Sequence, residues 1–426
     1  MQKSVAIIGL GYVGLPVACL CAPKYKVIGV DTDKNKVSLL EEGKCPIKDE
    51  NLERKIKELK GKGKIKFTSN VKEAVSQSDI VIICVPTPVD KNHIPDLTAL
   101  KSAAVSVSNA MKENTLVIIE STVFPGTTEE VILPILKKSE VSKFYLAHCP
   151  ERIDPGNKNF TIGRIPRVVG GIDSDSSKKA HNFYESLIGS TNIMELSSVK
   201  AVEATKIMEN TFRDINIAFI NEMAMSFDKV GIDILEVIKG ASTKPFAFMP
   251  HYPGTGTGGH CIPIDPYYLI ERAKQSGFDH QFLSLARKIN ENMPHYTVDL
   301  LENELKKLNK KIENAKVGIL GLAYKANVDD TRESPALKVI EILKEKEAEV
   351  FVFDPYVKKE GSVENLDSLM HQCDYIILVT NHNEFKNMDL DKLKENNIKI
   401  IIDGRNCLDK DKVKALEILY HGIGSS

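Results

Sequence analysis

The sequence predicts an α/β protein with two Rossmann-like, doubly wound domains, joined by a long central helix and a helical linker domain. Up to about residue 190, short apolar segments alternate with helical ones. Residues 199–230 then contain neither Gly nor Pro and carry apolar side chains at helical spacing, and after Lys316 the alternation returns. Continuous apolar strands separated by helices are typical of parallel sheets that helices cover on both faces.

The chain length agrees with several domains. At roughly 150 residues per domain, a chain of 426 residues has two or three of them. We expect an N-terminal domain over residues 1–195, a central helical domain over 196–308 and a C-terminal domain over 309–426. The expected strands are the apolar runs at residues 4–10, 26–31, 64–68, 79–86, 115–122 and 143–149, and later at 315–325, 349–356, 373–382 and 399–406. The expected central helices are 199–230, 269–276 and 282–308.

Composition and charge exclude several classes of protein. Hydrophobic residues make up 42% and charged residues 27% of the chain, which excludes wholesale disorder. The 57 basic and 58 acidic residues leave a net charge of −1, so neither nucleic acid nor an anionic membrane is expected as the main partner. No apolar run approaches the ~20 residues that span a bilayer. The N-terminus lacks the pattern of a signal peptide, so we expect a cytoplasmic protein.

The eight cysteines are scattered, and none forms a CxxC pair. This spacing supports neither a disulfide framework nor a zinc site, and we expect no metal. A free cysteine in a reducing compartment is usually a small buried hydrophobe, and a catalytic cysteine has to be distinguished from that ordinary case.

A GxGxxG motif follows the first expected strand. Gly9 allows the tight turn, Gly11 lets the backbone approach a pyrophosphate, and Gly14 allows the helix to pack closely on the strand. Asp31 lies 17 residues after Gly14, where a carboxylate can bind ribose hydroxyls and would repel a 2′-phosphate. The motif therefore predicts NAD rather than NADP, and the alternative is a structural turn in another α/β fold. Residues 319–325 resemble this turn as a weak internal repeat, which shared fold physics could also produce.

Three further loops follow expected strands, at residues 86–88, 120–123 and 148–152. Ligands of an open parallel sheet bind beyond the carboxyl ends of its strands, so we expect these loops to face the same crevice as the glycine turn. Glu151 could be a general base, or a surface carboxylate paired with Arg152. Spacing alone favours the second explanation.

The long helix carries a polar stripe of Glu203, Lys206, Asn210 and Arg213, spaced 3, 4 and 3 residues apart. A solvated face is the usual explanation of such a stripe. Lys206 and Asn210 could also present an ammonium and an amide to one oxyanion.

Four glycines precede a cysteine in the segment 254–261. Gly-rich backbone can approach a phosphate or a sugar closely. Cys261 lies in this loop rather than in an apolar run, and Asp265 follows four residues later. Beside a basic group, a cysteine can form the thiolate of a nucleophile. The segment alone leaves an inert, half-buried thiol as an equal alternative.

Taken together, these motifs resemble the UDP-glucose/GDP-mannose dehydrogenase family. The resemblance implies an NAD-binding N-terminal domain, a UDP-binding C-terminal domain and a helical linker that forms a homodimer. The matching segments run in family order from residue 5 to about 407, and they read GLGYVG, CVPTP, ESTVFPGTT, PERIDPGN, AVEATKIMENTFRDINIAFINE, GTGTGGHCIPIDP, AYKANVDDTRESP and DGRN.

The family oxidises a primary alcohol at C6 of a nucleotide sugar to a carboxylate and reduces two NAD⁺. The resemblance implies that Cys261 is the nucleophile, which forms a thiohemiacetal and then a thioester. The other implied roles are oxyanion stabilisation by Lys206 and Asn210, removal of the alcohol proton by Lys206 or a water on Asp265, hydrolysis assisted by Glu151, and positioning of water by Thr122.

The resemblance also implies binding residues, and no metal. The implied NAD contacts are Gly9, Gly11, Tyr12, Val13, Gly14, Asp31, Lys36, Pro86, Thr87, Ser121, Thr122 and Arg332. The implied contacts of the UDP-sugar are Glu151, Arg152, Ile153, Asp154, Lys206, Asn210, Arg213, Lys244, Tyr252, Gly254, Gly256, Gly258, Tyr324, Lys325 and Arg405.

Two departures from the UDP-glucose members concern the sugar. Those members typically read NPEFL where this chain has CPERIDPGN, and GGSC where it has GGHC. Both favour the subgroup that acts on UDP-N-acetylhexosamines, and KPFAF resembles the UDP-N-acetylglucosamine 6-dehydrogenases. Thr255 and Thr257 lie where the subgroup often has GPGxGGH. The open alternatives are a UDP-N-acetylmannosamine dehydrogenase, a UDP-glucose 6-dehydrogenase, a two-electron hydroxy acid dehydrogenase and a non-catalytic nucleotide-sugar sensor.

Overall fold

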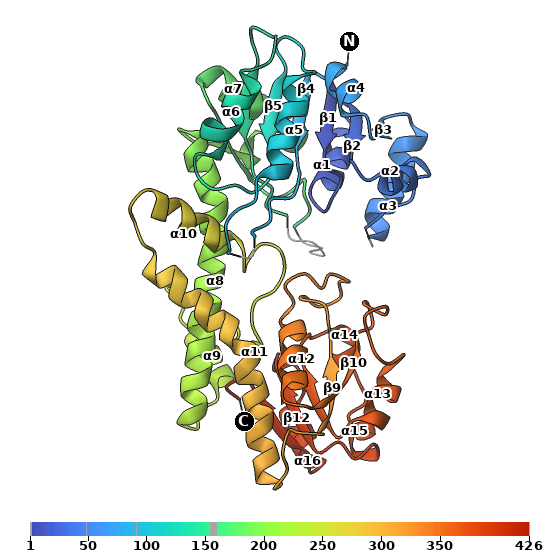
Figure 1. Cartoon of the computed structure of the whole chain (residues 1–426), viewed down its shortest axis with the longest axis vertical. Helices are drawn as coiled ribbons and strands as arrows, with labels where there is room; N and C mark the ends of the chain where they lie inside the picture. The colour runs from blue at the N-terminus through green and yellow to red at the C-terminus, as the bar shows by residue number, and fades with distance from the viewer. Residues whose placement is uncertain (1, 48, 91, 154–159, 426) are drawn as a thin grey trace. The chain divides into compact units, whose positions relative to one another are not determined.

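The computed structural model describes residues 2–47, 49–90, 92–153 and 160–425 (Figure 1). The chain divides into two compact units. The first unit consists of Met1–Glu209 and Tyr267–Phe278, and the second of Asn210–Pro266 and Asp279–Ser426. The division into three domains stays a prediction.

The first unit is built on an eight-stranded sheet with the order β3-β2-β1-β4-β5-β6-β7-β8. Neighbouring strands are parallel except β6 and β7, so the prediction of a parallel sheet is wrong at this one pair. The six predicted strands are present, whereas β7 and β8 were not predicted. Strand β7 begins with an arginine and ends with two glycines, so its sequence lacks the apolar run that predicts a strand. The strands are β1 Ser4–Ile8, β2 Lys26–Val30, β3 Ile65–Thr68, β4 Ile80–Ile83, β5 Leu116–Ile119, β6 Tyr145–His148, β7 Arg167–Gly171 and β8 Ile193–Glu195.

Successive residues of β1 enter two different cores. Val5 and Ile7 pack with residues of α1, α2, α3 and α7, whereas Ala6 and Ile8 pack with residues of α4, α5 and α6. A strand that is buried on both faces has to be apolar throughout, which explains the continuous apolar runs. The helices are α1 Gly14–Cys21, α2 Lys34–Glu41, α3 Glu50–Gly61, α4 Val71–Ser76, α5 Thr98–Ser108, the π-helix η1 Thr128–Ile132, α6 Leu133–Leu136, α7 Ser174–Ile188 and the 3₁₀ turn η2 Ser190–Asn192.

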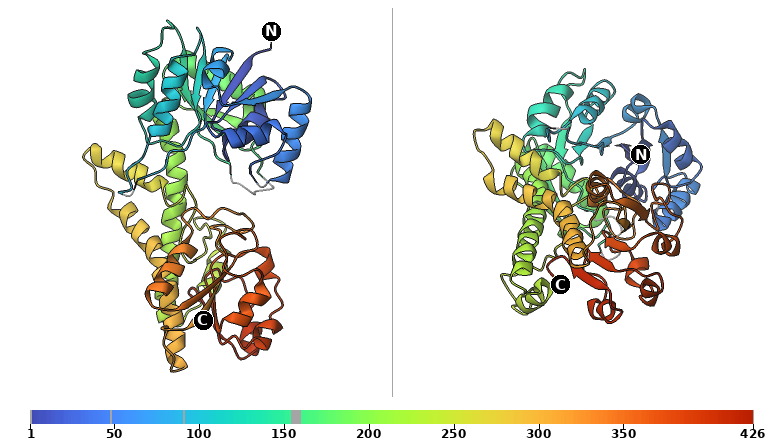
Figure 2. Two further views of the ribbon diagram at one scale, coloured as in Figure 1. Left: turned by 45° about the vertical axis from the view of Figure 1, so that its right-hand side comes forward. Right: turned by 60° about the horizontal axis from the view of Figure 1, so that its bottom comes forward.

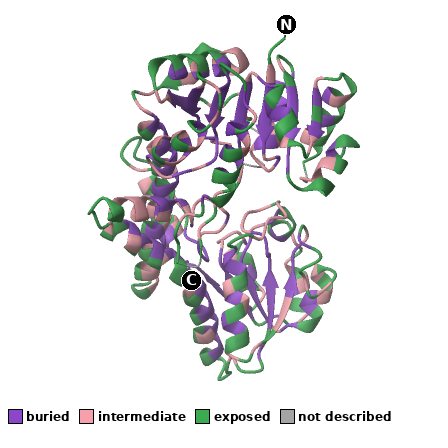
Figure 3. Cartoon of the chain, turned by 45° about the horizontal axis from the view of Figure 1, so that its top comes forward, coloured by how far each residue is buried: buried purple, intermediate pink, exposed green. Residues whose placement is uncertain are grey.

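The second unit is built on a wholly parallel five-stranded sheet with the order β10-β9-β11-β12-β13. The four predicted strands are present, and β13, which reads LYHG, was not predicted. Figure 3 shows the strands of both sheets mainly buried. The strands are β9 Lys316–Leu320, β10 Glu349–Phe353, β11 Tyr375–Leu378, β12 Ile400–Asp403 and β13 Leu419–Gly422. The helices are α9 Ile234–Ala241, α11 Gln281–Lys307, α12 Pro335–Glu345, α13 Leu366–Gln372, α14 Asn383–Lys386, α15 Asp391–Glu395 and α16 Lys410–Ala415.

Two helices continue from one unit into the other along the chain. They are α8, Val199–Lys229, and α10, Asp265–Gln275. The 31 residues of α8, light green in Figure 2, confirm the predicted long central helix. With two Rossmann-like sheets and these intervening helices, the predicted fold class is confirmed.

Both sheets begin with the same arrangement of strand, glycine turn and acid. The N–H of Gly9 (φ 93°) donates to the last carbonyl of β2 at 2.8 Å, and the next N–H donates to Asp31 at 2.9 Å. The N–H of Gly321 (φ 97°) donates to the last carbonyl of β10 at 2.9 Å, and the next N–H donates to Asp354 at 2.7 Å. The weak internal repeat of the sequence therefore has a structural counterpart.

Candidate active site

Packing shapes the first glycine turn at two of its three glycines. A Cβ atom on Gly9 would lie 2.6 Å from the carbonyl oxygen of Cys84, and one on Gly14 would lie 1.8 Å from the carbonyl oxygen of Gly9. At Gly11, no other atom of the described residues lies within 4 Å of that position. The fold therefore requires Gly9 and Gly14, whereas the space beside Gly11 fits the close approach of a pyrophosphate. Tyr12 and Val13 complete the turn, half-buried.

Asp31 lies directly after β2, and its carboxylate already accepts three hydrogen bonds. Oδ2 accepts from the N–H of Leu10 (2.9 Å) and from Lys36 Nζ (2.8 Å), and Oδ1 accepts from the N–H of Asp33 (3.0 Å). Burial opposes ionisation, but these hydrogen bonds outweigh it and lower the pKa of Asp31. A carboxylate offers about four lone-pair positions, so one remains for a ribose hydroxyl.

The loops after β4 and β5 are joined to each other. Thr87 Oγ1 donates to the carbonyl oxygen of Thr122, and Ser121 Oγ donates to that of Val85, both at 2.7 Å. Pro86 beside them is exposed. With the glycine turn, these predicted cofactor residues lie at the carboxyl ends of the neighbouring strands β1, β4 and β5, where open parallel sheets bind ligands.

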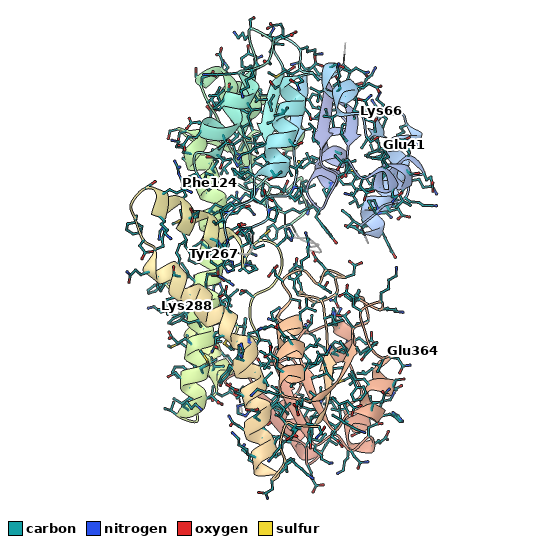
Figure 4. The ribbon with its side chains drawn as sticks, viewed as in Figure 1. Glu41, Lys66, Phe124, Tyr267, Lys288 and Glu364 are labelled. Atoms are coloured by element: carbon teal, nitrogen blue, oxygen red, sulfur yellow. The ribbon has the colours of Figure 1, made fainter. Side chains whose placement is uncertain are left out.

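The start of α10 is fastened to the same part of the first unit. The Tyr268 hydroxyl donates to the carbonyl oxygen of Thr87. Tyr267, labelled in Figure 4, stacks on His93 with the ring centroids 4.0 Å apart. These contacts fix the first turn of α10 against the loop that follows β4.

Glu151 is not a surface carboxylate paired with the Arg152 side chain, so the explanation favoured by spacing is wrong. Its exposed fraction is 6%. Oε1 accepts the backbone N–H of Arg152 at 2.7 Å, and Oε2 pairs with Nη2 of Arg167. The Arg152 guanidinium instead pairs with Glu209 at 2.5 Å. A cation 16 residues later in the chain is therefore the charged partner of Glu151.

A second carboxylate shares that cation. Glu120, 1% exposed, lies with Oε1 at 3.1 Å from Arg167 Nη1 and accepts the Tyr184 hydroxyl at 2.5 Å. Burial raises the pKa of Glu120 to about 7, with Arg167 opposing the shift and Glu151 adding to it. Sequence reasoning missed this network. The available signal was a lone arginine directly before an apolar pair and two glycines.

The polar stripe on α8 is buried at Glu203, Lys206 and Asn210, so the explanation as a solvated face is wrong there, whereas Arg213 is exposed. Glu203 is fully buried and accepts the backbone N–H groups of Gly126 (2.6 Å) and Thr128 (2.7 Å). Burial raises the pKa of Glu203 to about 7. Lys206 is 9% exposed and makes no hydrogen bond or ion pair with any residue that the structure describes. A buried ammonium without a partner is suited to an anionic ligand.

In the second unit, Asn210 connects two charged groups. It is 1% exposed, its Nδ2 donates to Asp265 Oδ2 at 2.5 Å, and its Oδ1 accepts from Arg213 Nη2 at 2.8 Å. Asp265 is 3% exposed. Its backbone N–H donates to the carbonyl oxygen of Cys261 at 2.8 Å, which closes a turn that places the half-buried Cys261 before α10.

The glycines before Cys261 are packed against the C-terminal sheet loops. A Cβ atom on Gly254 would lie 2.6 Å from the Arg405 guanidinium, and one on Gly258 would lie 2.7 Å from Tyr324. Gly256 has a φ of 133°, a backbone angle that residues with a side chain rarely adopt. Within this unit, the glycine loop therefore lies against Arg405 and Tyr324, two of the predicted substrate residues.

Arg332 lies beside the residue that precedes the cysteine. It pairs with Asp330 (2.6 Å), and its Nη2 lies 3.0 Å from Nδ1 of His260. The carbonyl oxygen of Arg332 accepts the N–H of Gly259 at 3.0 Å. Sequence reasoning predicted Arg332 as a cofactor contact and missed His260.

The remaining predicted substrate residues are more open. Lys244 and Tyr252 are exposed, and Lys325 and Ile153 are half-buried. Asp154 lies outside the described residues. Thr255 and Thr257, flagged for their place in the loop, are held by Gly404 (3.4 Å) and Arg287 (3.0 Å) respectively.

Family models agree with this arrangement of sheets and loops. Residues 3–188 match the NAD binding domain of the UDP-glucose/GDP-mannose dehydrogenase family, 200–292 match its central domain and 318–410 match its UDP binding domain. The chain belongs to this family. It is therefore an NAD-dependent UDP-sugar dehydrogenase, as predicted.

Relatives and solved structures agree over nearly the whole chain. UDP-N-acetyl-D-mannosamine dehydrogenase of Pyrococcus horikoshii is 39% identical, with 99% of each chain covered. UDP-N-acetyl-D-glucosamine 6-dehydrogenase of Pseudomonas aeruginosa is 36% identical, with 96% of this chain and 98% of the relative covered. The solved structure of the UDP-D-ManNAc dehydrogenase from P. horikoshii has a TM-score of 0.91 at 38% identity, with 99% of each chain covered. Among the described residues, no helix is long and apolar enough to cross a membrane.

Two glycine substitutions separate the fold from cofactor binding. Gly14→Ala should lower the free energy of unfolding by several kcal/mol, because its Cβ atom clashes with backbone. Gly11→Ala should leave the unfolding temperature unchanged and weaken NADH binding at least tenfold, because the methyl group fills the space for the pyrophosphate. Thermal unfolding and NADH fluorescence titration measure the two effects. Wild-type NADH affinity in folded Gly11→Ala would contradict this assignment.

Proposed function

We propose that this chain oxidises the C6 alcohol of a UDP-N-acetylhexosamine to the carboxylate in two successive oxidations, through a covalent intermediate on Cys261. The observation that carries the proposal is the turn that joins Cys261 to Asp265, with Asn210 buried behind it. The chain therefore holds a half-buried thiol and a carboxylate in one turn after its glycine loop, and the Asn210 amide on α8 donates a hydrogen bond to that carboxylate.

In the first oxidation, Lys206 or a water on Asp265 removes the proton of the C6 hydroxyl. When bound, NAD⁺ accepts the hydride from C6 in each of the two oxidations. The developing alkoxide needs a nearby positive charge, which Lys206, buried and without a partner among the described residues, supplies once it is protonated. Asn210 holds Asp265 in place.

Cys261 then adds to the C6 aldehyde and forms a thiohemiacetal. The second oxidation converts this adduct to a thioester. Covalent attachment holds the aldehyde on the protein while the spent cofactor is exchanged. In the last step, water attacks the thioester carbonyl with Glu151 accepting a proton from it, and the thiolate of Cys261 leaves. Thr122 helps to position that water.

We assign the cofactor to the edge formed by the glycine turn, Asp31 with Lys36, and the joined loops of Thr87 and Thr122, with Arg332 as a further contact. We assign the UDP-sugar to the glycine loop and its neighbours. The assigned UDP-sugar contacts, apart from those already given catalytic roles, are Arg152, Ile153, Arg213, Lys244, Tyr252, Gly254, Gly256, Gly258, Tyr324, Lys325 and Arg405.

Two sugars are candidates. The KPFAF segment favours UDP-N-acetylglucosamine. The names of several relatives favour UDP-N-acetylmannosamine, including the one that is 39% identical over 99% of this chain. UDP-glucose is a weaker candidate because the NPEFL and GGSC motifs are absent from the sequence.

The homodimer through α8 is also a proposal. Phe212 and Phe219 lie seven residues apart on one face of α8 and are 48% and 52% exposed. Exposed aromatic rings at this spacing fit the contact of two copies of the chain. Sedimentation should give twice the mass of the chain, and a monomer at micromolar concentration would contradict the proposal.

The stoichiometry of NADH tests the function directly. We expect two NADH per molecule of one UDP-N-acetylhexosamine, measured at 340 nm with limiting UDP-GlcNAc, UDP-ManNAc, UDP-GalNAc and UDP-glucose in turn. The sugar that reaches two identifies the substrate. A yield of one NADH would replace the proposal with a simple alcohol dehydrogenase, and binding without NADH would favour a sensor.

Cys261→Ser should abolish carboxylate formation, with a fall in kcat of at least about 10³-fold, because the hydroxyl is a poor nucleophile for this step. UDP-sugar binding should persist by calorimetry. Cys45→Ser, a half-buried cysteine in the first unit, is the matched control and should keep wild-type activity. Wild-type acid production by Cys261→Ser would rule out the covalent route.

A further inference from the structure

The single antiparallel pair of the first sheet brings a cation to the edge at which ligands bind. In the register of β6 and β7, Ala147 lies opposite Gly171 and His148 opposite Gly170. Three residues further on, the same register places Glu151 opposite Arg167. Because β7 runs against strands β1 to β6, its first residue lies at their carboxyl ends, where a strand parallel to them would place its last.

Arg167 divides its hydrogen bonds between two carboxylates. Nη2 pairs with Glu151, and Nη1 lies 3.1 Å from Glu120. The guanidinium carbon lies 4.9 Å from the ring centroid of Tyr184, whose hydroxyl also binds Glu120. Arg167 and Tyr184 are at most 2% exposed, so this charge is almost completely removed from water.

The thiol, phenol and imidazole groups described around Arg167 are neutral. Nη1 lies 3.8 Å from the Cys149 thiol, and burial raises the pKa of that thiol to about 12. Burial also raises the pKa values of Cys21, Cys84 and Tyr184 far above neutrality. His148 is fully buried, and burial lowers its pKa to about 3. Two carboxyl groups therefore share one guanidinium. The nearby guanidinium of Arg152, which donates to the carbonyl oxygen of Pro166, is paired with Glu209.

The contribution of the network of Arg167, Glu120 and Glu151 to the stability of the fold is small. Arg167 Nε and Glu120 Oε2 are buried and find no hydrogen-bond partner among the residues that the structure describes. Each such unsatisfied buried atom destabilises the fold, and a buried ion pair stabilises a fold little even when complete. Glu151, in contrast, is held at both oxygens. The network therefore fixes one carboxylate in orientation at a cost to stability.

We propose that Arg167 is a positioning residue for the hydrolytic step, which holds the Glu151 carboxylate in the orientation that accepts a proton from water. Glu120, which Tyr184 also binds, competes with Glu151 for the guanidinium and so sets the strength of the bond between Arg167 and Glu151. This inference rests on the proposed function of Glu151. In the step itself, the water oxygen bonds to the thioester carbon, the C–S bond breaks with its electron pair on sulfur, and the water proton passes to Glu151. Nothing is oxidised or reduced.

The test is the amount of covalent adduct during turnover, measured by intact-protein mass after rapid acid quench. In Arg167→Lys, a lysine keeps the charge but cannot bind two carboxylates as a fork. We expect the thioester adduct to accumulate on most of the protein and steady-state kcat to fall at least tenfold, with little change in KM and a normal first burst of NADH. Arg54→Lys, exposed on α3, is the matched control and should show no adduct.

Glu151→Gln separates the proposed role of Glu151 from the proposed role of Arg167. If folded Glu151→Gln accumulates no adduct, the proposed role of Glu151 fails. If it accumulates adduct and folded Arg167→Lys does not, the inference about Arg167 is overturned while the proposed function stands.

Glu120→Gln tests the network should Arg167→Lys not fold. Burial raises the pKa of Glu120 to about 7, so we expect the strength of its ion pair with Arg167 to change near that pH. We expect the pH profile of kcat to show an inflection near pH 7 in the wild type that Glu120→Gln removes while KM stays the same. An identical profile in the two proteins would overturn the part assigned to Glu120.

Discussion

In both units, many candidate binding residues lie just beyond the carboxyl ends of parallel strands. This constraint organises much of the molecule. Strands buried on both faces cannot carry polar side chains along their length, so chemistry is confined to the residues just beyond them. The glycine turn, Asp31 and the joined loops of Thr87 and Thr122 all occupy such positions in the first unit. Tyr324 and Arg405 do so in the second.

Burial at these edges changes the chemistry of the charged groups. Asp31 is held as a carboxylate by donors that outweigh burial, whereas burial dominates at Glu120 and Glu203 and raises their pKa values to about 7. Glu151 takes its charged partner from a strand that runs the other way. The first residue of β7 thus contributes a guanidinium at the edge where strands β1 to β6 end in loops.

The sequence predicted the helices and strands whose apolar residues recur with a clear spacing, but it did not predict the short strands. The apolar runs and the uninterrupted helical spacing of α8 predicted most strands and the central helix. Strands β7 and β13 escaped because glycines and polar residues break their short patterns. The same limit applies to the site. The glycine turn and Cys261 carry local signals, but the pairing of Glu151 with Arg167 depends on strand register, which spacing along the chain does not reveal.

The two similar glycine turns differ in how much bonding capacity their acids retain. Asp31 accepts three hydrogen bonds, which leaves room for one more. Asp354 accepts four from backbone N–H groups, and His382 Nε2 lies 3.0 Å from it as well. Its lone pairs are therefore saturated by its own chain. Of these two similar turns, the N-terminal one therefore keeps an acid that can accept a further hydrogen bond from a ribose hydroxyl, and the second does not.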